Sequence, residues 1–245
     1  MTTARDPQRR RVPSWLREIT VLVVVALVLS VSLQTFVGRV YFIPSESMEP
    51  TLHGCAGCTG DRIIVDKMTF RFGDPEPGDV VVFRAPTSSW NVGYSSGRST
   101  NPIAKALQDA GSWVGLVAPD ENDLVKRVIA TGGQTVQCCD AEGRVEVDGQ
   151  PLDEPYVVMD FPFVENTLTC ETTPQSGRCF GPVTVPTGNL WVMGDNRSGS
   201  ADSRAHRTDE LGGTVPVGDV IGKARLIVLP PSRWGTIESP SIRQH

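Results

Sequence analysis

The chain has 245 residues, of which 39% are hydrophobic, and a formal net charge of -5 at pH 7. This length accommodates one transmembrane segment and one folded domain of about 200 residues. The mildly acidic balance argues against a nucleic-acid surface, so no nucleic-acid partner is expected. The 24 glycines and 19 prolines favour short strands joined by frequent turns over a helical bundle.

Residues 19–37, ITVLVVVALVLSVSLQTFV, form an uncharged apolar run. As a helix at about 1.5 Å per residue, this run would span roughly 28 Å, close to the hydrocarbon thickness of a bilayer. It exceeds the h-region of a cleavable signal peptide, and no small-x-small cleavage site closes it. It is also apolar on every face, unlike a core helix with a polar stripe. We therefore expect an uncleaved transmembrane anchor.

The charges around this run predict its orientation. The arginines that precede it are Arg5, Arg9, Arg10, Arg11 and Arg17, whereas only Arg39 lies close behind it. The positive-inside bias then places residues 1–18 in the cytoplasm and makes 38–229 an extracytoplasmic domain of a single-pass plasma-membrane protein. Residues 230–245 are expected to form a loose C-terminal tail.

Residues 43–52, IPSESMEPTL, carry two serines two positions apart between two prolines. Proline disfavours helix in the residue before it, so this segment is expected to be a stiff, extended ribbon. In such a ribbon Ser45 and Ser47 face the same way. One can serve as nucleophile while the hydroxyl of the other donates a hydrogen bond. Serine and proline also cluster in ordinary loops, so the segment alone does not indicate catalysis.

Six cysteines fit an exported domain in which disulfides persist. Cys55 and Cys58 form a CxxC, for which we expect a local disulfide. The full connectivity is not readable, since six cysteines allow fifteen pairings. A zinc site at the CxxC lacks a second ligand pair at the usual spacing, so no metal is expected.

Further along, residues 61–67 and 79–83 read as strands, 86–102 as a loop and 103–117 as the one helix outside the anchor. Asn101 can cap that helix. The helix could lie on lipid, but packing against the domain is the favoured use. Further strands are expected at 123–130, 134–137, 144–147, 183–185, 190–193 and 217–229. Residues 138–182 have the weakest pattern and are interpreted as an insertion.

Three segments together suggest chemistry: the serine segment, the strand DLVKRVIA at 123–130 with Lys126, and GDNRSGSADSR at 194–204. This combination resembles the bacterial type I signal peptidases, whose serine, lysine and GDNR-type boxes occur here in the same order. The resemblance covers most of residues 15–229, and the segment HGCAGCTGDR at 53–62 is most similar to the actinobacterial branch. The family's glycine-proline-glycine after the lysine strand is replaced by residues 131–134, TGGQ.

The resemblance implies a mostly β fold of coiled antiparallel sheets with a signal peptidase/LexA-like catalytic core, one N-terminal transmembrane helix and a short additional helix. It implies that Ser47 is the nucleophile, Lys126 the general base and Ser200 the residue that orients the lysine. The Ser45 hydroxyl and the Ser47 backbone N–H would form the oxyanion hole. The residues expected to brace the site are Asp195, Asn196, Arg197, Asp202 and Arg204.

The implied substrates are signal peptides of exported preproteins, cleaved after small residues that fit shallow apolar subsites. The residues expected to line these subsites are Ile43, Pro44, Met48, Leu52 and Val125. Membrane lipid and the protein-export machinery are the other expected partners, and no cofactor or metal is expected.

The chemistry of lysine is consistent with this role. A serine hydroxyl needs a neighbouring base to accept its proton, and lysine can do so only when neutral. At a reference pKa of about 10.4, roughly one lysine in 2,500 is neutral at pH 7, so burial must lower the pKa by several units. The apolar neighbours of Lys126 predict such burial.

Three alternatives remain open. A Ser-His-Asp hydrolase could use Ser47, His53 or His206, and Asp195 or Asp202, although no GxSxG elbow occurs. A self-cleaving Ser-Lys repressor shares the chemistry but would be soluble and carry a DNA-binding domain. A non-enzymatic, membrane-anchored envelope module would use the cysteines as scaffold and the serine segment as a plain loop.

Overall fold

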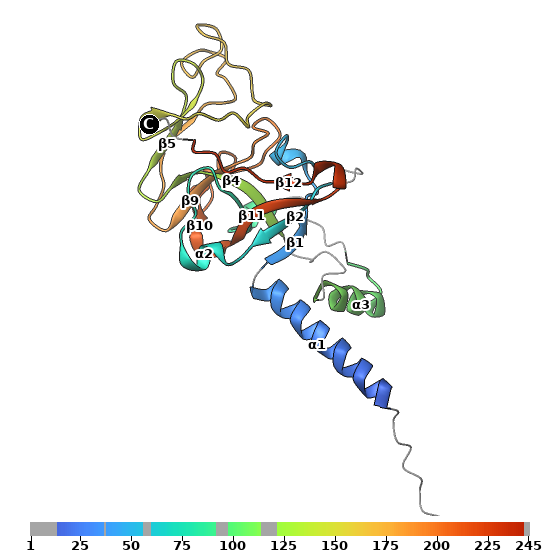
Figure 1. The fold of residues 1–245 in the computed structure, drawn as a ribbon. Helices are drawn as coiled ribbons and strands as arrows, with labels where there is room; N and C mark the ends of the chain where they lie inside the picture. The colour runs from blue at the N-terminus through green and yellow to red at the C-terminus, as the bar shows by residue number, and fades with distance from the viewer. Residues whose placement is uncertain (1–13, 37, 56–59, 92–97, 114–121, 243–245) are drawn as a thin grey trace, which may run out of the picture.

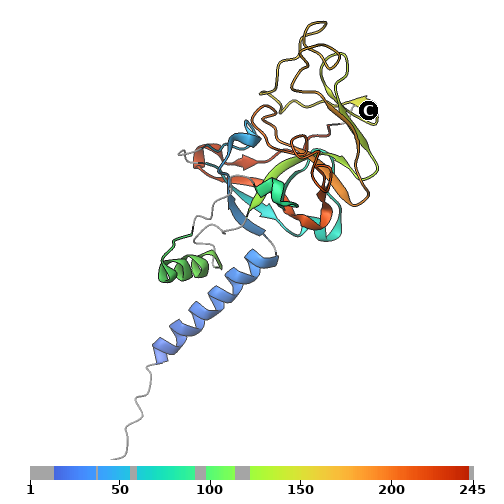
Figure 2. The ribbon, with the colours of Figure 1, turned by 180° about the vertical axis from the view of Figure 1, so that it is seen from behind.

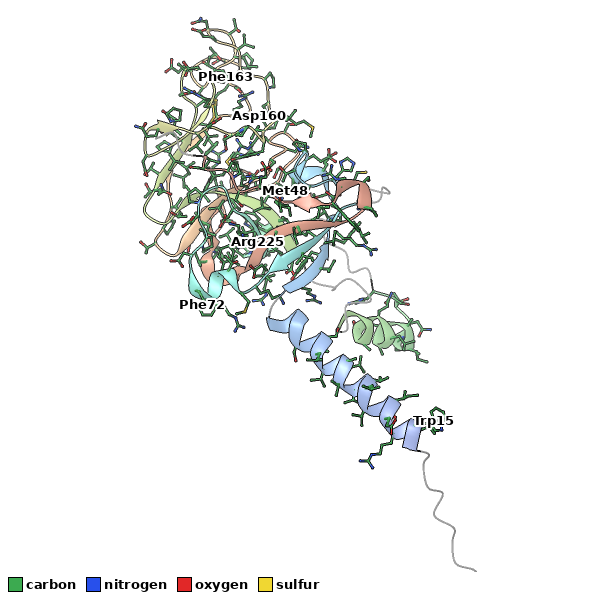
Figure 3. All side chains as sticks on the ribbon, in the orientation of Figure 1. Trp15, Met48, Phe72, Asp160, Phe163 and Arg225 are labelled. Atoms are coloured by element: carbon green, nitrogen blue, oxygen red, sulfur yellow. A yellow bond between two sulfur atoms is a disulfide. The ribbon has the colours of Figure 1, made fainter. Side chains whose placement is uncertain are left out.

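The computed structural model describes residues 14–36, 38–55, 60–91, 98–113 and 122–242. Figure 1 shows a β domain from which one long N-terminal helix, α1 (Ser14–Phe36), extends. Its 18-residue window Trp15–Ser32 is not buried anywhere, and the helix is long and apolar enough to cross a membrane. Trp15, labelled in Figure 3, lies at the end of α1 remote from the β domain.

The larger sheet has eight antiparallel strands in the order β1-β2-β11-β3-β4-β9-β10, with β12 paired to β11. Its strands are β1 (Gly38–Phe42), β2 (Arg62–Asp66), β3 (Val80–Arg84), β4 (Asp123–Thr131), β9 (Asn189–Met193), β10 (Val215–Pro216), β11 (Val220–Leu229) and β12 (Gly235–Thr236). The register of β3 and β4 pairs Val81 with Lys126. Sequence separation between neighbouring strands is large, so the sheet gathers segments from the whole chain.

A smaller antiparallel sheet has the order β7-β6-β5-β8. Its strands are β5 (Thr135–Cys138), β6 (Val145–Val147), β7 (Gln150–Pro151) and β8 (Phe180–Thr184). The region 138–182, interpreted above as an insertion, therefore begins inside β5 and ends inside β8. The turn that leads into this sheet contains Gly133 with φ +90°, a left-handed conformation that suits glycine.

The core explains why β3 and β4 read as apolar runs. Val80 and Val82 pack in one buried cluster with Ile63 and Val65, whereas Val81 and Phe83 pack in another on the opposite face. A third cluster lies between the two sheets and contains Trp191 stacked on Phe180, with ring centroids 5.5 Å apart. The predicted mostly β fold of coiled antiparallel sheets with an N-terminal apolar helix is confirmed.

The helical elements outside α1 are short. They are η1 (Glu46–Met48), α2 (Thr69–Phe72), η2 (Ser88–Asn91), α3 (Pro102–Trp113), η3 (Val217–Asp219) and η4 (Pro231–Arg233). Helix α3 begins as predicted: Asn101 Oδ1 accepts a hydrogen bond from the backbone N–H of Ile103 over 3.0 Å. The expected packing of its apolar side on the domain is wrong, because Ile103 and Leu107 are 73% and 69% exposed. Figure 2 shows α3 lying apart from both sheets.

The C-terminal segment after β11 is packed on the domain up to residue 242. The prediction of a loose tail is therefore wrong for these residues. Strand β12 pairs with β11, and Ile237 and Ile242 are buried. The Glu238 carbonyl accepts a hydrogen bond from Arg127 over 3.0 Å. The segment stays ordered because its two isoleucines cover apolar surface and its carbonyl satisfies a buried guanidinium.

Candidate active site

The serine segment is not extended throughout. Ser45 is extended, with φ −128° and ψ 157°, but Glu46–Met48 forms a 3-10 turn. The proline rule restricts only the residue before each proline, and Glu49 is extended as predicted, with φ −66° and ψ 143°. The prediction of a continuous ribbon is therefore wrong for the residues between, which are free to coil.

The turn still brings the two serines together and presents them to the lysine strand. Ser45 Oγ lies 3.3 Å from Ser47 Oγ. Lys126 Nζ, on β4, donates a hydrogen bond to Ser47 Oγ over 2.7 Å. A hydroxyl in direct contact with an amine, beside a second hydroxyl, is an arrangement suited to acyl transfer through a covalent intermediate.

The surroundings of Lys126 disfavour its positive charge. Its side chain is 4% exposed, and burial lowers its pKa from 10.5 to about 8, although the carboxylates of Asp202 and Asp195 oppose this shift. With that pKa, roughly one lysine in ten is neutral at pH 7. The buried strand thus holds an amine that is neutral far more often at pH 7 than the amine of a solvated lysine.

Ser200 lies next to this pair without contacting the lysine. Its Oγ is buried and has no hydrogen-bond partner among the described residues. A side chain at Gly194 would collide with Ser200 Oγ and with the Ser47 carbonyl oxygen. The glycine of the GDNR stretch is therefore required for the close approach of this loop to the turn that carries Ser47.

Asp195 joins three segments around the site. Arg127 Nε donates to its Oδ1 over 2.9 Å and Arg127 Nη2 to its Oδ2 over 2.7 Å, and both side chains are buried. Thr51 Oγ1, just after the turn that carries Ser47, donates to Asp195 Oδ2 over 2.5 Å. Arg127, the residue after the lysine, and Thr51, in the segment carrying the serine, are thus both bound to the Asp195 carboxylate. The pair of Arg127 with Asp195 is bidentate, a geometry that fixes the position of both side chains.

Asn196 adds hydrogen bonds to the turn Glu46–Met48 itself. Its backbone N–H donates to the Ser47 carbonyl over 3.2 Å, and its Nδ2 donates to the Glu46 carbonyl over 3.2 Å. These bonds fix the backbone on both sides of the Ser47 N–H.

Asp202 and Arg204 form a second buried pair behind the lysine. Asp202 accepts hydrogen bonds from Arg204 Nε over 2.9 Å and from the Gly194 N–H over 2.9 Å. Burial alone would raise the pKa of Asp202, but the Arg204 hydrogen bonds and charge hold it below the usual range. Asp202 therefore remains a carboxylate near Lys126.

Arg197 is held by a residue that the sequence did not identify. Its Nη1 donates to Glu154 Oε2 over 3.0 Å, and its backbone N–H donates to the Met159 carbonyl over 2.8 Å. Tyr156 OH donates to Glu154 Oε1 over 3.0 Å, and its ring lies under Arg127 at 3.9 Å. Residues 154–159 lie in the region of weakest pattern, and a lone Glu in such a stretch carries no signal that could have revealed this contact.

The five residues expected to line subsites divide into two groups. Ile43, Met48 and Leu52 are 3%, 1% and 0% exposed and belong to the buried cluster that contains Val80. Pro44 is exposed and Val125 is half-buried. Figure 3 shows Met48 within the β domain. The buried group supports the floor of the site, and only Pro44 and Val125 have side chains that are partly accessible.

Neither histidine of the rival triad contacts the serine. His53 Nδ1 lies 2.9 Å from Glu49 Oε1. His206 stacks on Trp90 with ring centroids 4.2 Å apart, and its pKa is lowered by burial. Trp90, in the loop of 86–102, is buried and anchors that loop to the domain through Asp209.

The structure pairs four of the six cysteines within the β domain. Cys138 bonds to Cys139 and Cys170 bonds to Cys179. The predicted bridge between Cys55 and Cys58 includes residues 56–59, which lie outside the described residues. It stays a prediction.

Comparison with known proteins adds an independent observation. The family model described as "Signal peptidase, peptidase S26" matches residues 16–229. The chain is 57% identical over 244 residues to the signal peptidase I of Mycobacterium tuberculosis (strain CDC 1551 / Oshkosh), a match covering 98% of this chain and 81% of that protein. It is 54% identical over 251 residues to the probable signal peptidase I of Mycobacterium leprae (strain TN), covering 98% and 84%. The crystal structure of a signal peptidase I from Enterococcus faecalis V583 has a TM-score of 0.35 and 23% identity, covering 62% of this chain and 97% of that chain.

Proposed function

The chain belongs to the signal peptidase family, peptidase S26, and we propose that it cleaves signal peptides from exported preproteins with Ser47 as nucleophile and Lys126 as general base. Membership of the family makes it a serine endopeptidase, as its motifs predicted, and the Mycobacterium relatives fit the expected actinobacterial branch. The observation that carries the assignment of the dyad is the 2.7 Å contact between Lys126 Nζ and Ser47 Oγ in a buried site.

The reaction follows from this contact. Neutral Lys126 accepts the proton of Ser47 Oγ while that oxygen attacks the scissile carbonyl carbon. The resulting oxyanion receives hydrogen bonds from the Ser45 hydroxyl and the Ser47 N–H, which lies in the first turn of η1, where N–H groups have no partner within the helix. Protonated Lys126 then donates its proton to the leaving amine. In the second half, Lys126 activates a water that hydrolyses the acyl-enzyme.

Three further sets of residues support the dyad. Ser200 orients Lys126, since its buried Oγ has no other partner among the described residues and can accept a hydrogen bond from a rotated Nζ. Asp195 and Asn196 hold the serine turn against β4. Asp202 with Arg204, and Arg197 with Glu154, hold the GDNR loop.

The substrate lies extended along the site and adds its backbone to a strand edge. Cleavage follows small side chains, which enter shallow subsites lined by Pro44 and Val125, with Ile43, Met48 and Leu52 beneath them. Helix α1 anchors the enzyme in the plasma membrane, with residues 1–18 in the cytoplasm and the β domain outside. Membrane lipid and the export machinery are its proposed partners, and the reaction uses no cofactor.

Incubation of the detergent-solubilised protein with a labelled preprotein tests this function against the non-enzymatic envelope module. We expect two products and a mature N-terminus preceded by a small residue, as determined by sequencing. An intact preprotein after prolonged incubation would favour the envelope module. Cleavage after large residues would refute the proposed subsites.

A further inference from the structure

Helix α3 has an apolar side that none of the described residues covers. Ile103 and Leu107 are 73% and 69% exposed. At about 100° per residue, Ile103, Leu107 and Ala110 fall on one side of the helix, whereas Lys105 and Asp109 fall on the other. Exposed aliphatic side chains gathered on one helix face mark a surface that contacts something else.

The polar side of α3 is held by the residues before it. Arg98 Nε lies 3.1 Å from Asp109 Oδ1, and the Ser99 N–H donates to Gln108 Oε1 over 2.8 Å. These contacts fix the rotation of the helix about its own axis. The apolar side therefore faces away from the chain segment that holds α3.

Helix α3 lies on the same side of the β domain as α1. In Figures 1 and 2, α3 is drawn at the height of the part of α1 next to the β domain, and apart from both sheets. The apolar side chains of α1 are exposed over its whole membrane-length window. An amphipathic helix next to a transmembrane helix, at the level where the span meets the folded domain, has the placement of a helix that lies in the bilayer interface.

We propose that α3 is an interfacial helix that inserts Ile103 and Leu107 into the same bilayer that α1 spans, in the leaflet facing the β domain. This inference rests on the proposed anchoring by α1. Lipid is the occupant because α3 lies at the level of the exposed, membrane-length helix α1, while its polar side, with Lys105, faces away from the bilayer.

The contact has a consequence for catalysis. Helix α3 lies in the connection between β3 and β4, and Lys126 is the fourth residue of β4. A second membrane contact in this connection holds the base and its strand close to the bilayer surface, where the cleavage site of a membrane-inserted preprotein emerges. With α1 alone, the β domain could pivot about a single chain crossing.

Photocrosslinking of the full chain in phosphatidylethanolamine–phosphatidylglycerol vesicles tests the contact. A photoreactive benzoyl-phenylalanine is placed at Ile103 or Leu107, and for comparison at Lys105 on the polar side and at exposed Val164, beside Phe163 at the end of the molecule remote from α1 (Figure 3). We expect phospholipid adducts at positions 103 and 107 and no such adducts at positions 105 and 164. Equal lipid yields at all four positions, or adducts with protein in place of lipid at 103 and 107, would overturn the proposal.

A kinetic arm uses Ile103→Glu with Leu107→Glu in one variant and Val164→Glu as the matched control. In vesicles, cleavage of a membrane-inserted preprotein should fall by roughly tenfold or more for the double variant, because burial of each aliphatic side chain supplies at least about that equilibrium factor. Cleavage of a short soluble peptide in detergent should be unchanged, which shows that the site is intact. An unchanged rate in vesicles would also refute the contact. Failure of the wild-type chain to cleave any preprotein would refute the proposed function. The lipid adducts would still test the contact of α3 with the bilayer.

Discussion

The buried amine of Lys126 is chemically useful because its position makes the charged form unfavourable. Burial lowers its pKa to about 8, and Asp202 and Asp195 prevent a larger fall. Compared with a solvated lysine, the neutral fraction at pH 7 rises by roughly two powers of ten. Burial, opposed by two carboxylates, thus places the pKa of Lys126 near the range that the proposed general base requires.

This pKa predicts the pH dependence of cleavage. In the proposed mechanism the neutral lysine is the active form, so the rate should rise with pH, about tenfold per unit below the pKa, and level off above pH 8. The measurement is kcat/KM for a soluble peptide across pH 5 to 10 in detergent, at about constant ionic strength. A rise centred near pH 6.5, the reference value of about 6.5 for histidine, would instead indicate a histidine base.

Ser45 has a smaller expected effect than the dyad. Ser45→Ala removes one oxyanion donor and leaves the Ser47 N–H, so kcat should fall by about 10²- to 10³-fold. Ser45→Thr keeps a hydroxyl and is the matched control. A loss confined to KM would place Ser45 in substrate binding and contradict its role at the oxyanion.

Between elements, the site is held by buried ion pairs that cross from one segment to another. Arg127 on β4 reaches Asp195 in the GDNR loop, and Arg197 in that loop reaches Glu154 beyond the smaller sheet. Both pairs are almost fully buried, so loss of either partner leaves a charge without compensation in a medium of low polarity. The smaller sheet and its loops are therefore part of the support of the active site.

Glu154→Gln tests this support. It leaves Arg197 buried without its countercharge, and the free energy of unfolding should fall by about 3 to 5 kcal/mol. The matched control is Glu142→Gln, because the pair of Glu142 with Arg144 is 67% and 41% exposed. Its loss should cost no more than about 1 kcal/mol. Denaturant unfolding in detergent compares the two, and equal effects would show that Glu154 provides no buried support.

The strands and the local motifs could be predicted from the sequence because they depend on short-range pattern. The buried runs of β3 and β4 and the Asn101 cap of α3 follow from residues within one turn or strand. The 3-10 turn at Glu46–Met48 could not be predicted, because the prolines constrain only their own neighbours.

The long-range parts of the site had no local signal. The contact of Glu154 with Arg197 joins residues 43 positions apart, and that of Glu238 with Arg127 joins residues 111 apart. Glu154 contributes a single carboxylate and Glu238 contributes only its backbone carbonyl. Both residues lie in stretches without periodicity. The order of the C-terminal segment was missed for the same reason, since two isolated isoleucines do not form a pattern.

For the whole molecule, the topology follows from the arginines before α1. We expect residues 1–18 in the cytoplasm and the β domain outside. Protease added to intact cells should digest the β domain and leave an N-terminal tag protected, and permeabilised cells should lose the tag as well. Protection of the β domain in intact cells would show the opposite orientation.

The central claim is that Ser47 and Lys126 act as one catalytic unit, and preprotein cleavage by the wild-type chain and five variants tests it most directly. Ser47→Ala and Lys126→Met should each abolish cleavage, and the double variant should be hardly worse than either, since effects within a catalytic unit are strongly non-additive. His53→Ala and His206→Ala, as folded controls, should keep their activity. Cleavage that persists in Lys126→Met, or that is lost in either folded histidine variant, would contradict the dyad.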